Sequence, residues 1–155
     1  MKYIAHRGQT AGPKPNNENH PALIELALNK GYDVEIDLCM QNGKLYLGHD
    51  GPEHSIDEKF LQNSKFWIHV KDKEALEWIS KQKSYPYNYF WHENDKYTVT
   101  SRGYIWAHPS SELTESSVMV MPESIDPKMK NAIYAKCFAI CSDYVDHIKK
   151  IRDML

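Results

Sequence analysis

Four short groups of polar residues in the N-terminal half of the chain carry side chains that can exchange protons, hold a cation or bind an anion. They are His6-Arg7, Glu35-x-Asp37, His49-Asp50 and His69-x-Lys71. A histidine exchanges protons near neutral pH, and an arginine can bind a phosphate or carboxylate through two parallel hydrogen bonds. A single His-Arg or His-Asp pair is usually a capping or surface feature, so these groups gain meaning only if the fold brings them together.

The segment Asp33–Met40 is the most informative stretch, because its carboxylates fall on one face of a predicted strand. Alternate side chains of a strand share a face. One face then carries Val34, Ile36, Leu38 and Met40, and the other carries Asp33, Glu35, Asp37 and Cys39. Buried carboxylates each cost several kcal/mol unless they are paired or bound to metal. Glu35 and Asp37 are therefore well placed to hold one hard cation through oxygen ligands. The alternative is an edge strand with one solvated face.

A later predicted strand, Phe66–Lys71, repeats this pattern with Trp67, His69 and Lys71 on one face. An imidazole and an ammonium group on the inner face of a central strand again need partners. Further along, the segment from Phe90 to Trp106 is dense in aromatic and hydroxyl side chains, which suit a ligand the size of a sugar or a base. The alternative interpretation is core aromatics with a polar turn, and we favour it for the tyrosines.

Alternating strands and helices are expected to position these groups. We expect strands at residues 3–5, 33–40, 44–48, 66–71, 87–91, 104–107, 117–121 and 137–141. Helices are expected to begin at Pro21 and after Asp72, Asp126-Pro127 and Ser142, since prolines and capping residues stand there. This order predicts an α/β fold with a mainly parallel sheet in one domain, residues 1–155, with the active site at the strand ends.

Composition excludes several other classes of protein. Of the 155 residues, 41% are hydrophobic and 26% charged, as in an ordinary globular domain. Lysine and arginine number 19 against 21 aspartates and glutamates, so polymeric nucleic acid and anionic membrane are poor partners. We find no apolar run long enough for a membrane span, no signal-peptide segment and no C-x-x-C motif among the three cysteines. We therefore predict a cytoplasmic, reduced protein.

Together, the polar groups form a series that resembles a known family. His6-Arg7-Gly8, Glu18-Asn19, Glu35-x-Asp37 and His49-Asp50 follow the order and spacing of the glycerophosphodiester phosphodiesterases, within the phosphatidylinositol phospholipase C-like superfamily. The resemblance covers residues 1–71, and residues 140–144 resemble the close of the family's last strand. The family has a TIM-barrel fold, and it uses two histidines and a divalent cation, usually Mg²⁺ or Ca²⁺, to act on a phosphodiester.

The resemblance implies a role for each matching residue. It makes His6 and His49 the acid–base pair, Arg7 a phosphate ligand, Glu35 and Asp37 metal ligands, and Glu18 and Asp50 supporting residues.

Three further residues extend this set. His69 stands where the family has a glutamate metal ligand, and Lys71 keeps the place of a family lysine beside the phosphate. A neutral ligand makes the site less purely one for Mg²⁺ or Ca²⁺ and more tolerant of Mn²⁺. Trp106 is a candidate to stack on the substrate.

The length of the chain departs from the family. A (β/α)8 barrel typically needs about 250 residues. The resemblance therefore implies a compact or incomplete TIM (β/α) barrel with reduced outer helices, mainly between Tyr87 and Ser117. Apolar strand faces exposed by such losses predict a homodimer.

The expected function is metal-dependent cleavage of a small glycerol- or sugar-type phosphodiester by His/His acid–base catalysis. If a neighbouring hydroxyl attacks the phosphorus, a cyclic phosphate forms first, and the sequence leaves its release or hydrolysis open. The segment from Phe90 to Trp106 is similar to one in small superfamily members linked to surface-glycan pathways. Two alternatives stay open: a degenerate barrel that binds a phosphorylated sugar or glycerol without turnover, and a nuclease or nucleotide phosphodiesterase with Trp91 or Trp106 stacked on a base.

Overall fold

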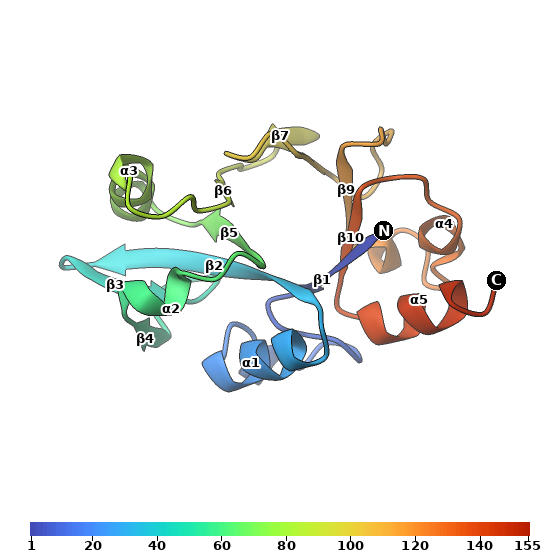
Figure 1. The fold of residues 1–155 in the computed structure, drawn as a ribbon, viewed down its shortest axis with the longest axis horizontal. Helices are drawn as coiled ribbons and strands as arrows, with labels where there is room; N and C mark the ends of the chain where they lie inside the picture. Colours follow the sequence, from blue (N-terminus) through green and yellow to red (C-terminus); the bar gives the residue numbers. More distant parts are fainter.

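The computed structural model describes all 155 residues and is built on one ten-stranded sheet that curls into a half-barrel (Figure 1). The strands are β1 (Lys2–His6), β2 (Asp33–Gln41), β3 (Lys44–Leu47), β4 (His54–Ile56), β5 (Phe66–Val70), β6 (Tyr89–Phe90), β7 (Tyr97–Val99), β8 (Ile105–Ala107), β9 (Ser117–Val120) and β10 (Ala139–Ser142). The helices are α1 (Pro21–Asn29), α2 (Glu58–Leu61), α3 (Lys73–Lys81), α4 (Lys130–Ile133) and α5 (Val145–Arg152), with 3-10 turns at Pro15–Asn17 and Pro122–Ser124.

Strand β2 lies at the centre of the sheet and pairs along both edges. Its first residues pair with β1 and its last with β3, whereas β5 occupies the opposite edge. The pairs β1–β10, β1–β2, β2–β5, β5–β6, β9–β10 and β8–β9 are parallel, and β3, β4 and β7 run antiparallel to their neighbours. The alternative of an edge strand with a solvated carboxylate face is therefore wrong.

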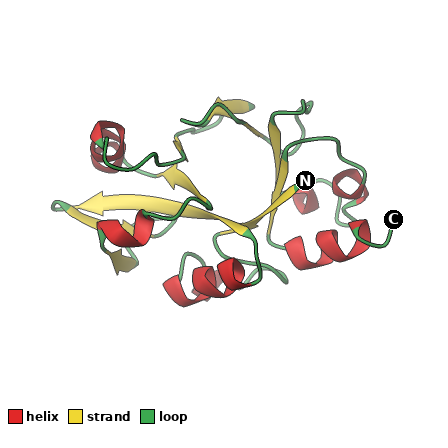
Figure 2. Cartoon of the chain, in the orientation of Figure 1, coloured by secondary structure: helices red, strands yellow, loops and turns green.

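The expected α/β architecture, a compact or incomplete TIM (β/α) barrel with reduced outer helices, is also wrong. No helix lies between Lys81 and Pro122, and turns alone connect the strands β6 to β9 (Figure 2). The links 91–96, 100–104 and 108–116 are too short for a helix that crosses back over the sheet. The architecture is instead a mixed, curled sheet with few helices, because β3, β4 and β7 return as antiparallel strands.

Local signals placed the N-terminal elements well. The Asn42-Gly43 turn, with φ of 53° and 73°, joins β2 to β3 as expected. The Asp72 carboxylate caps α3 by accepting from the Ala75 amide at 2.8 Å and also accepts from the Met40 amide of β2 at 2.7 Å. The helix expected after Asp126-Pro127 shrinks to the single turn of α4, and the elements β4, β7 and α2 were not anticipated.

The two faces of the sheet carry different side chains. On the outer face, α1, α3 and α5 pack on β1, β2 and β10 over an aliphatic core. On the inner face, an aromatic cluster fills the curl: Ile4, Trp67, Phe90, Trp106, Val118, Ala139 and Cys141. Because strand side chains alternate, residues two positions beyond this cluster rise toward the carboxyl ends of the same strands. Separately, no helix of the structure is both long and apolar enough to cross a bilayer.

Candidate active site

The predicted polar groups meet on the inner face, one layer above the aromatic cluster. His6 stands two positions after Ile4 on β1, and His69 stands two positions after Trp67 on β5. Each histidine therefore lies on the same face of the sheet as that member of the aromatic cluster. Glu35 and Asp37 project from β2 between them, with registers His6↔Glu35 and Asp37↔His69. Three parallel strands therefore bring together residues that are far apart in the sequence.

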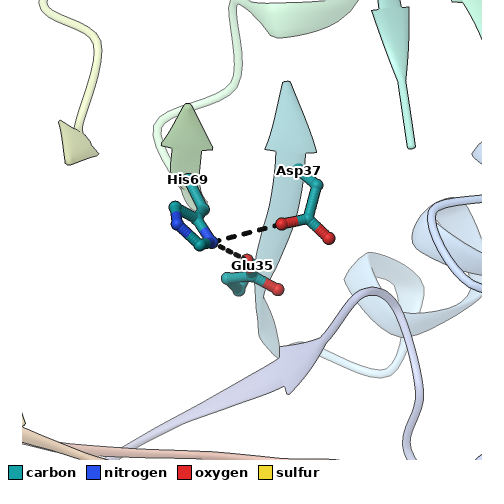
Figure 3. Close-up of side chains that lie close together, drawn as sticks. All are labelled: Glu35, Asp37 and His69. Atoms are coloured by element: carbon teal, nitrogen blue, oxygen red, sulfur yellow. Dashed lines mark ion pairs between the residues drawn. The ribbon is translucent and has the colours of Figure 1, made fainter. Parts of the chain in front are cut away.

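Glu35, Asp37 and His69 form a buried triad (Figure 3). The Nδ1 atom of His69 lies 3.2 Å from Oδ1 of Asp37 and 3.8 Å from Oε1 of Glu35. The three residues retain 2%, 0% and 8% of their exposed area, in the order Glu35, Asp37, His69. The third carboxylate of the face, Asp33, is not part of the triad, because Lys2 and the Trp67 indole already donate to it.

The donor set of the triad fits one divalent cation. Two ligands about 2.1 Å from a cation are about 3.0 Å apart at a right angle and about 4.2 Å apart across it. The two separations from His69, 3.2 and 3.8 Å, fall within that range, and the ligand atoms of all three residues lie within 4.8 Å of one another. In addition, Oδ1 of Asp37 and Nε2 of His69 are buried without a hydrogen-bond partner, so the Asp37 oxygen that faces His69 has unused capacity as a ligand.

Charge interactions push the acidities of the two carboxyls apart. Burial and the neighbouring Asp37 charge raise the pKa of Glu35. Burial alone would also raise the pKa of Asp37, but the His49 and His69 rings and the Arg7 guanidinium hold it well below its usual range. Asp37 therefore stays ionised, and a cation bound between the two carboxyls would favour ionised Glu35 as well.

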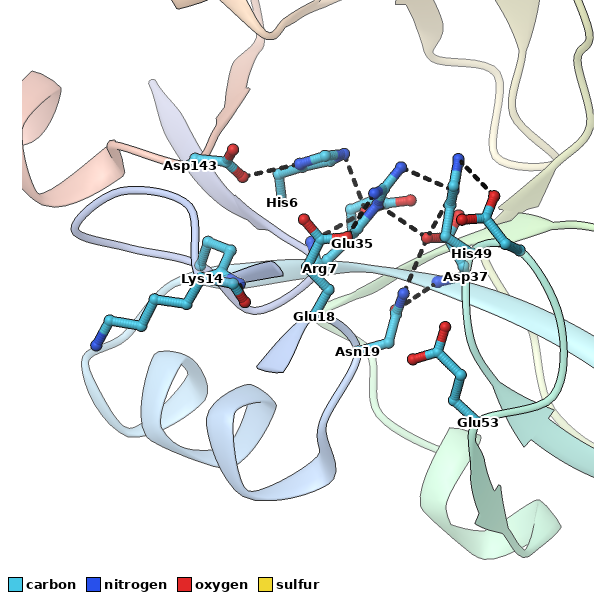
Figure 4. A network of polar contacts seen from close by, with 12 residues as sticks. His6, Arg7, Lys14, Glu18, Asn19, Glu35, Asp37, His49, Glu53 and Asp143 are labelled. Atoms are coloured by element: carbon cyan, nitrogen blue, oxygen red, sulfur yellow. Dashed lines mark hydrogen bonds and ion pairs between the residues drawn. The ribbon is translucent and has the colours of Figure 1, made fainter. Parts of the chain in front are cut away.

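Arg7 lies at the centre of the surrounding network (Figure 4). Its guanidinium donates from Nη1 to Glu18 at 2.7 Å, contacts Asp37 through Nε at 3.0 Å and donates from Nη2 to Nδ1 of His49 at 2.7 Å. Its backbone, at φ 50°, is in the left-handed region, and its amide donates to Glu35 at 3.1 Å. The strand end is thus bent so that both the amide and the side chain of Arg7 face the carboxylates.

His6 is oriented by a residue from the other end of the chain. Its Nδ1 atom lies 2.8 Å from Oδ1 of Asp143, which directly follows β10. The Asp143 amide in turn donates to Glu123 at 2.9 Å. Burial tends to lower the pKa of His6, but the Asp143 hydrogen bond and the Glu35 charge outweigh it, so the pKa lies above its ordinary value.

His49 approaches the same carboxylates from the loop after β3. Its Nδ1 atom lies 3.3 Å from Oδ2 of Asp37, and its side chain is 35% exposed. A side chain at Gly48 would overlap the carbonyl oxygen of Gly51, so only glycine lets this loop turn so tightly. The side chain of Asp50 is 95% exposed, and its Oδ1 atom lies 3.9 Å from the Nε2 atom of His49. This distance is too long for a hydrogen bond.

Lys71 and Trp106, the two remaining sequence-predicted residues, lie in different surroundings. The Lys71 ammonium is 3.9 Å from Oδ1 of Asp37 and lines a cavity of about 400 Å³ beside the triad. Trp106 is only 6% exposed, stacks on Phe90 within the aromatic cluster and lines a different space of about 70 Å³. The structure therefore brings Lys71 to the polar site and Trp106 to the core beneath it.

Comparison of the chain with family models, curated proteins and solved structures finds no match. The assignment of a function to this site therefore depends on its geometry.

Three residues of the site had no role in the sequence prediction. Asn19, at φ 58°, exchanges two hydrogen bonds of 2.9 Å with the carboxylate and amide of Asp37. Asp143 could be found only by knowing that β10 pairs with β1. His92 stacks on His69, with ring centroids 4.6 Å apart, and burial and the nearby His69 lower its pKa. A signal existed for His92, because it stands two positions after the inward Phe90.

Proposed function

We propose that this chain is a metal-dependent phosphodiesterase. The observation that carries the proposal is the convergence of two histidines, from β1 and from the loop after β3, on a buried carboxylate pair in which Oδ1 of Asp37 has no hydrogen-bond partner. An acid, a base and a cation site within one cluster are the components that cleavage of a phosphodiester needs. A pure binding site would have no need for two oriented histidines.

The hydrogen bonds of the two histidines support a separate role for each. A carboxylate only accepts hydrogen bonds, so the Nδ1 atom of His6 carries the proton shared with Asp143, and its Nε2 atom is free to accept a proton. The Nδ1 atom of His49 lies 2.7 Å from Arg7, which only donates, and 3.3 Å from Oδ2 of Asp37, which only accepts. We take the shorter contact to decide, so Nδ1 accepts from Arg7 and Nε2 carries the proton. His6 then acts as the base toward water or a substrate hydroxyl, and His49 as the acid toward the leaving alkoxide.

Glu35, Asp37 and His69 would hold the cation, which polarises a phosphoryl oxygen when bound. Carboxylate ligands favour Mg²⁺ or Ca²⁺, and the imidazole of His69 extends the range to Mn²⁺. Lys71 supplies further positive charge at the phosphate oxygens, next to Arg7. The guanidinium of Arg7 is already engaged by three side chains, so it contributes as part of a fixed positive frame.

The proposed substrate is a small diester of glycerol or a sugar, in a cytoplasmic setting that includes surface-glycan metabolism. We further propose that the open edge of the sheet pairs with a second copy of the chain. The exposed side chains of Tyr97 and Val99 on β7 support this, at 45% and 67% of full exposure. A sedimentation mass equal to one chain would contradict the dimer alone.

Phosphorus NMR of purified protein with a panel of diesters tests the activity. The panel contains glycerophosphodiesters, an aryl phosphodiester and a nucleotide-linked glycerol, each with Mg²⁺, Ca²⁺ or Mn²⁺. We expect metal-dependent product that is lost in His6→Ala and in His49→Ala, and the spectra distinguish cyclic from open phosphates. Binding of these diesters without product under any metal would instead favour the alternative of a binding protein without turnover.

A further inference from the structure

The 400 Å³ cavity beside the triad has walls that none of the proposed catalytic steps uses. Its floor is formed by His69 of β5 and by Lys71, which directly follows β5, and its wall by Trp91, His92 and Glu93, which directly follow β6. The volume falls in the range of about 300–1,000 Å³ that is usual for small-molecule sites. Because His69 belongs to both the triad and the floor, a phosphoryl group at the triad extends directly into this space.

A second cavity, of about 300 Å³, shares two of its lining residues with the first. His49 and Lys71 line both spaces, and the second continues along Gln41, Asp50 and Pro52. A phosphodiester has two substituents on one phosphorus, and a proposed acid and a proposed phosphate ligand line both cavities. The two cavities therefore offer separate spaces for the two arms of a diester.

The side chains of the larger cavity select among the arms that it could hold. The face of an indole suits the apolar face of a ring, and a carboxylate such as Glu93 accepts hydrogen bonds from hydroxyl groups. Lys71 and Glu93 line the same cavity, so a charged arm is repelled by one of these residues as well as attracted by the other. A neutral polyhydroxylated ring meets neither repulsion.

We propose that the cavity walled by Trp91, His92 and Glu93 binds the sugar ring of a sugar-bearing phosphodiester, while the cavity along Gln41 and Pro52 takes the compact second arm. This inference rests on the proposed phosphodiesterase. It makes Trp91 and Glu93 residues that determine which diester is bound, without a part in the proton transfers.

Calorimetric titration separates the two arms. Glucose 1-(methyl phosphate), glycerol 3-(methyl phosphate) and methyl phosphocholine are each titrated with Mg²⁺ present into the full chain carrying His6→Ala, which removes turnover. We expect Trp91→Ala to weaken binding of the glucose diester about tenfold and that of the glycerol diester less than about twofold. Trp91→Phe keeps an aromatic face and should recover most of the loss, and Gln41→Ala is the matched control from the other cavity.

Trp91 is half-buried against the main core, so Glu93→Gln provides an independent, exposed variant. It should weaken the glucose diester about threefold and leave the glycerol diester unchanged. Equal effects on both diesters, no effect on either, no binding of the glucose diester, or tighter binding of the choline diester would each overturn the inference.

Binding that depends on Trp91 without turnover by the wild type would contradict the phosphodiesterase and keep the cavity assignment. Turnover that is insensitive to Trp91 would support the phosphodiesterase and contradict the cavity assignment.

Discussion

The inner face of the sheet is built differently on its two sides. On the side of β1, β2, β5 and β10, strands of four to nine residues form continuous parallel ladders, and helices cover their outer face. On the side of β6, β7 and β8, strands of two or three residues lie without any covering helix. The first side holds the ionised side chains, and the second contributes Phe90 and Trp106 to the aromatic cluster beneath them.

This difference follows from what each kind of side chain requires. Buried charges are stable only when partners are held at fixed distances, which long ladders and packed helices provide. Aromatic rings stabilise the fold through the apolar surface that they bury and through stacking, and they tolerate a less regular backbone. Only one backbone hydrogen bond, from Ser101 to Tyr89, joins β6 to the segment after β7. We therefore expect the charged side to determine activity and the aromatic side to determine stability and substrate fit.

The largest effect on turnover is expected when a histidine is removed from the charged side. His6→Ala should lower turnover about a thousandfold, since proton transfer by a positioned side chain contributes about 10²–10⁴. The melting temperature should change little, because α5 and the β1 ladders remain. Initial rates and thermal melts measure both. His20→Ala, an exposed histidine outside the cluster, is the control, and a collapse of the fold in His6→Ala would mean a structural role.

On the aromatic side, Trp106→Ala should lower the stability of the fold and leave substrate binding nearly unchanged. Deleting a buried indole costs about 3–5 kcal/mol of unfolding free energy, and Trp106 contacts both Trp67 and Phe90. Denaturant titration gives the loss, and KM of the residual folded protein should be nearly unchanged. A large rise in KM at unchanged stability would instead restore Trp106 as a substrate-binding residue.

The metal preference gives a smaller and sharper test. His69→Glu adds a third carboxylate to the triad, which should tighten Mg²⁺ about tenfold and reduce the relative preference for Mn²⁺. Calorimetric metal titration measures both affinities, and His92→Gln serves as the control on the neighbouring ring. Weaker Mg²⁺ binding by the glutamate variant would place His69 outside the metal site.

The smallest effect is expected at a partly exposed ion pair that is not part of the site. Lys30 and Tyr32 donate to Asp146 at 2.6 and 2.8 Å. Partial burial raises the pKa of Asp146, but these bonds outweigh it and lower the pKa. A lowered pKa stabilises the fold above the unfolded value of about 3.9, and this contribution is lost as the pH falls through the folded value.

Asp146→Asn should therefore lower the unfolding free energy by about 0.2–1 kcal/mol at pH 7, as for other exposed pairs. The difference from the wild type should vanish near pH 2 and shrink in high salt. Urea titrations at the two pH values measure it. A difference that persists in acid would show that packing, rather than charge, stabilises this contact.

The sequence was informative where the chemistry is local. The alternation in Asp33–Gln41 placed Glu35 and Asp37 on one face, and both are buried on the inner face of the central strand. The same period of two placed His69 and Lys71 beside them. Asn42-Gly43 and Asp72 fixed the turn and the helix start that hold these strands.

The sequence was misleading where pairing between distant strands decides the position of a residue. We expected an incomplete (β/α) barrel with reduced helices between Tyr87 and Ser117, but the unanticipated strands β4 and β7 pair antiparallel to their neighbours and make the sheet mixed. Asp143 lies 137 positions from His6, so no local pattern connects the two residues. Trp106 was assigned to substrate because of its neighbours in sequence, whereas the parallel pairing of β8 with β9 turns it into the core.

Metal-dependent turnover in two matched variants of β2 tests the central claim most directly. Asp33 and Asp37 are both buried on the same face, but Asp33 accepts from Lys2 and Trp67, whereas Asp37 belongs to the triad. With Mn²⁺ and a diester that the wild type cleaves, phosphorus NMR should show product from Asp33→Asn and none from Asp37→Asn. Equal turnover by the two variants would contradict a metal-dependent active site at Asp37.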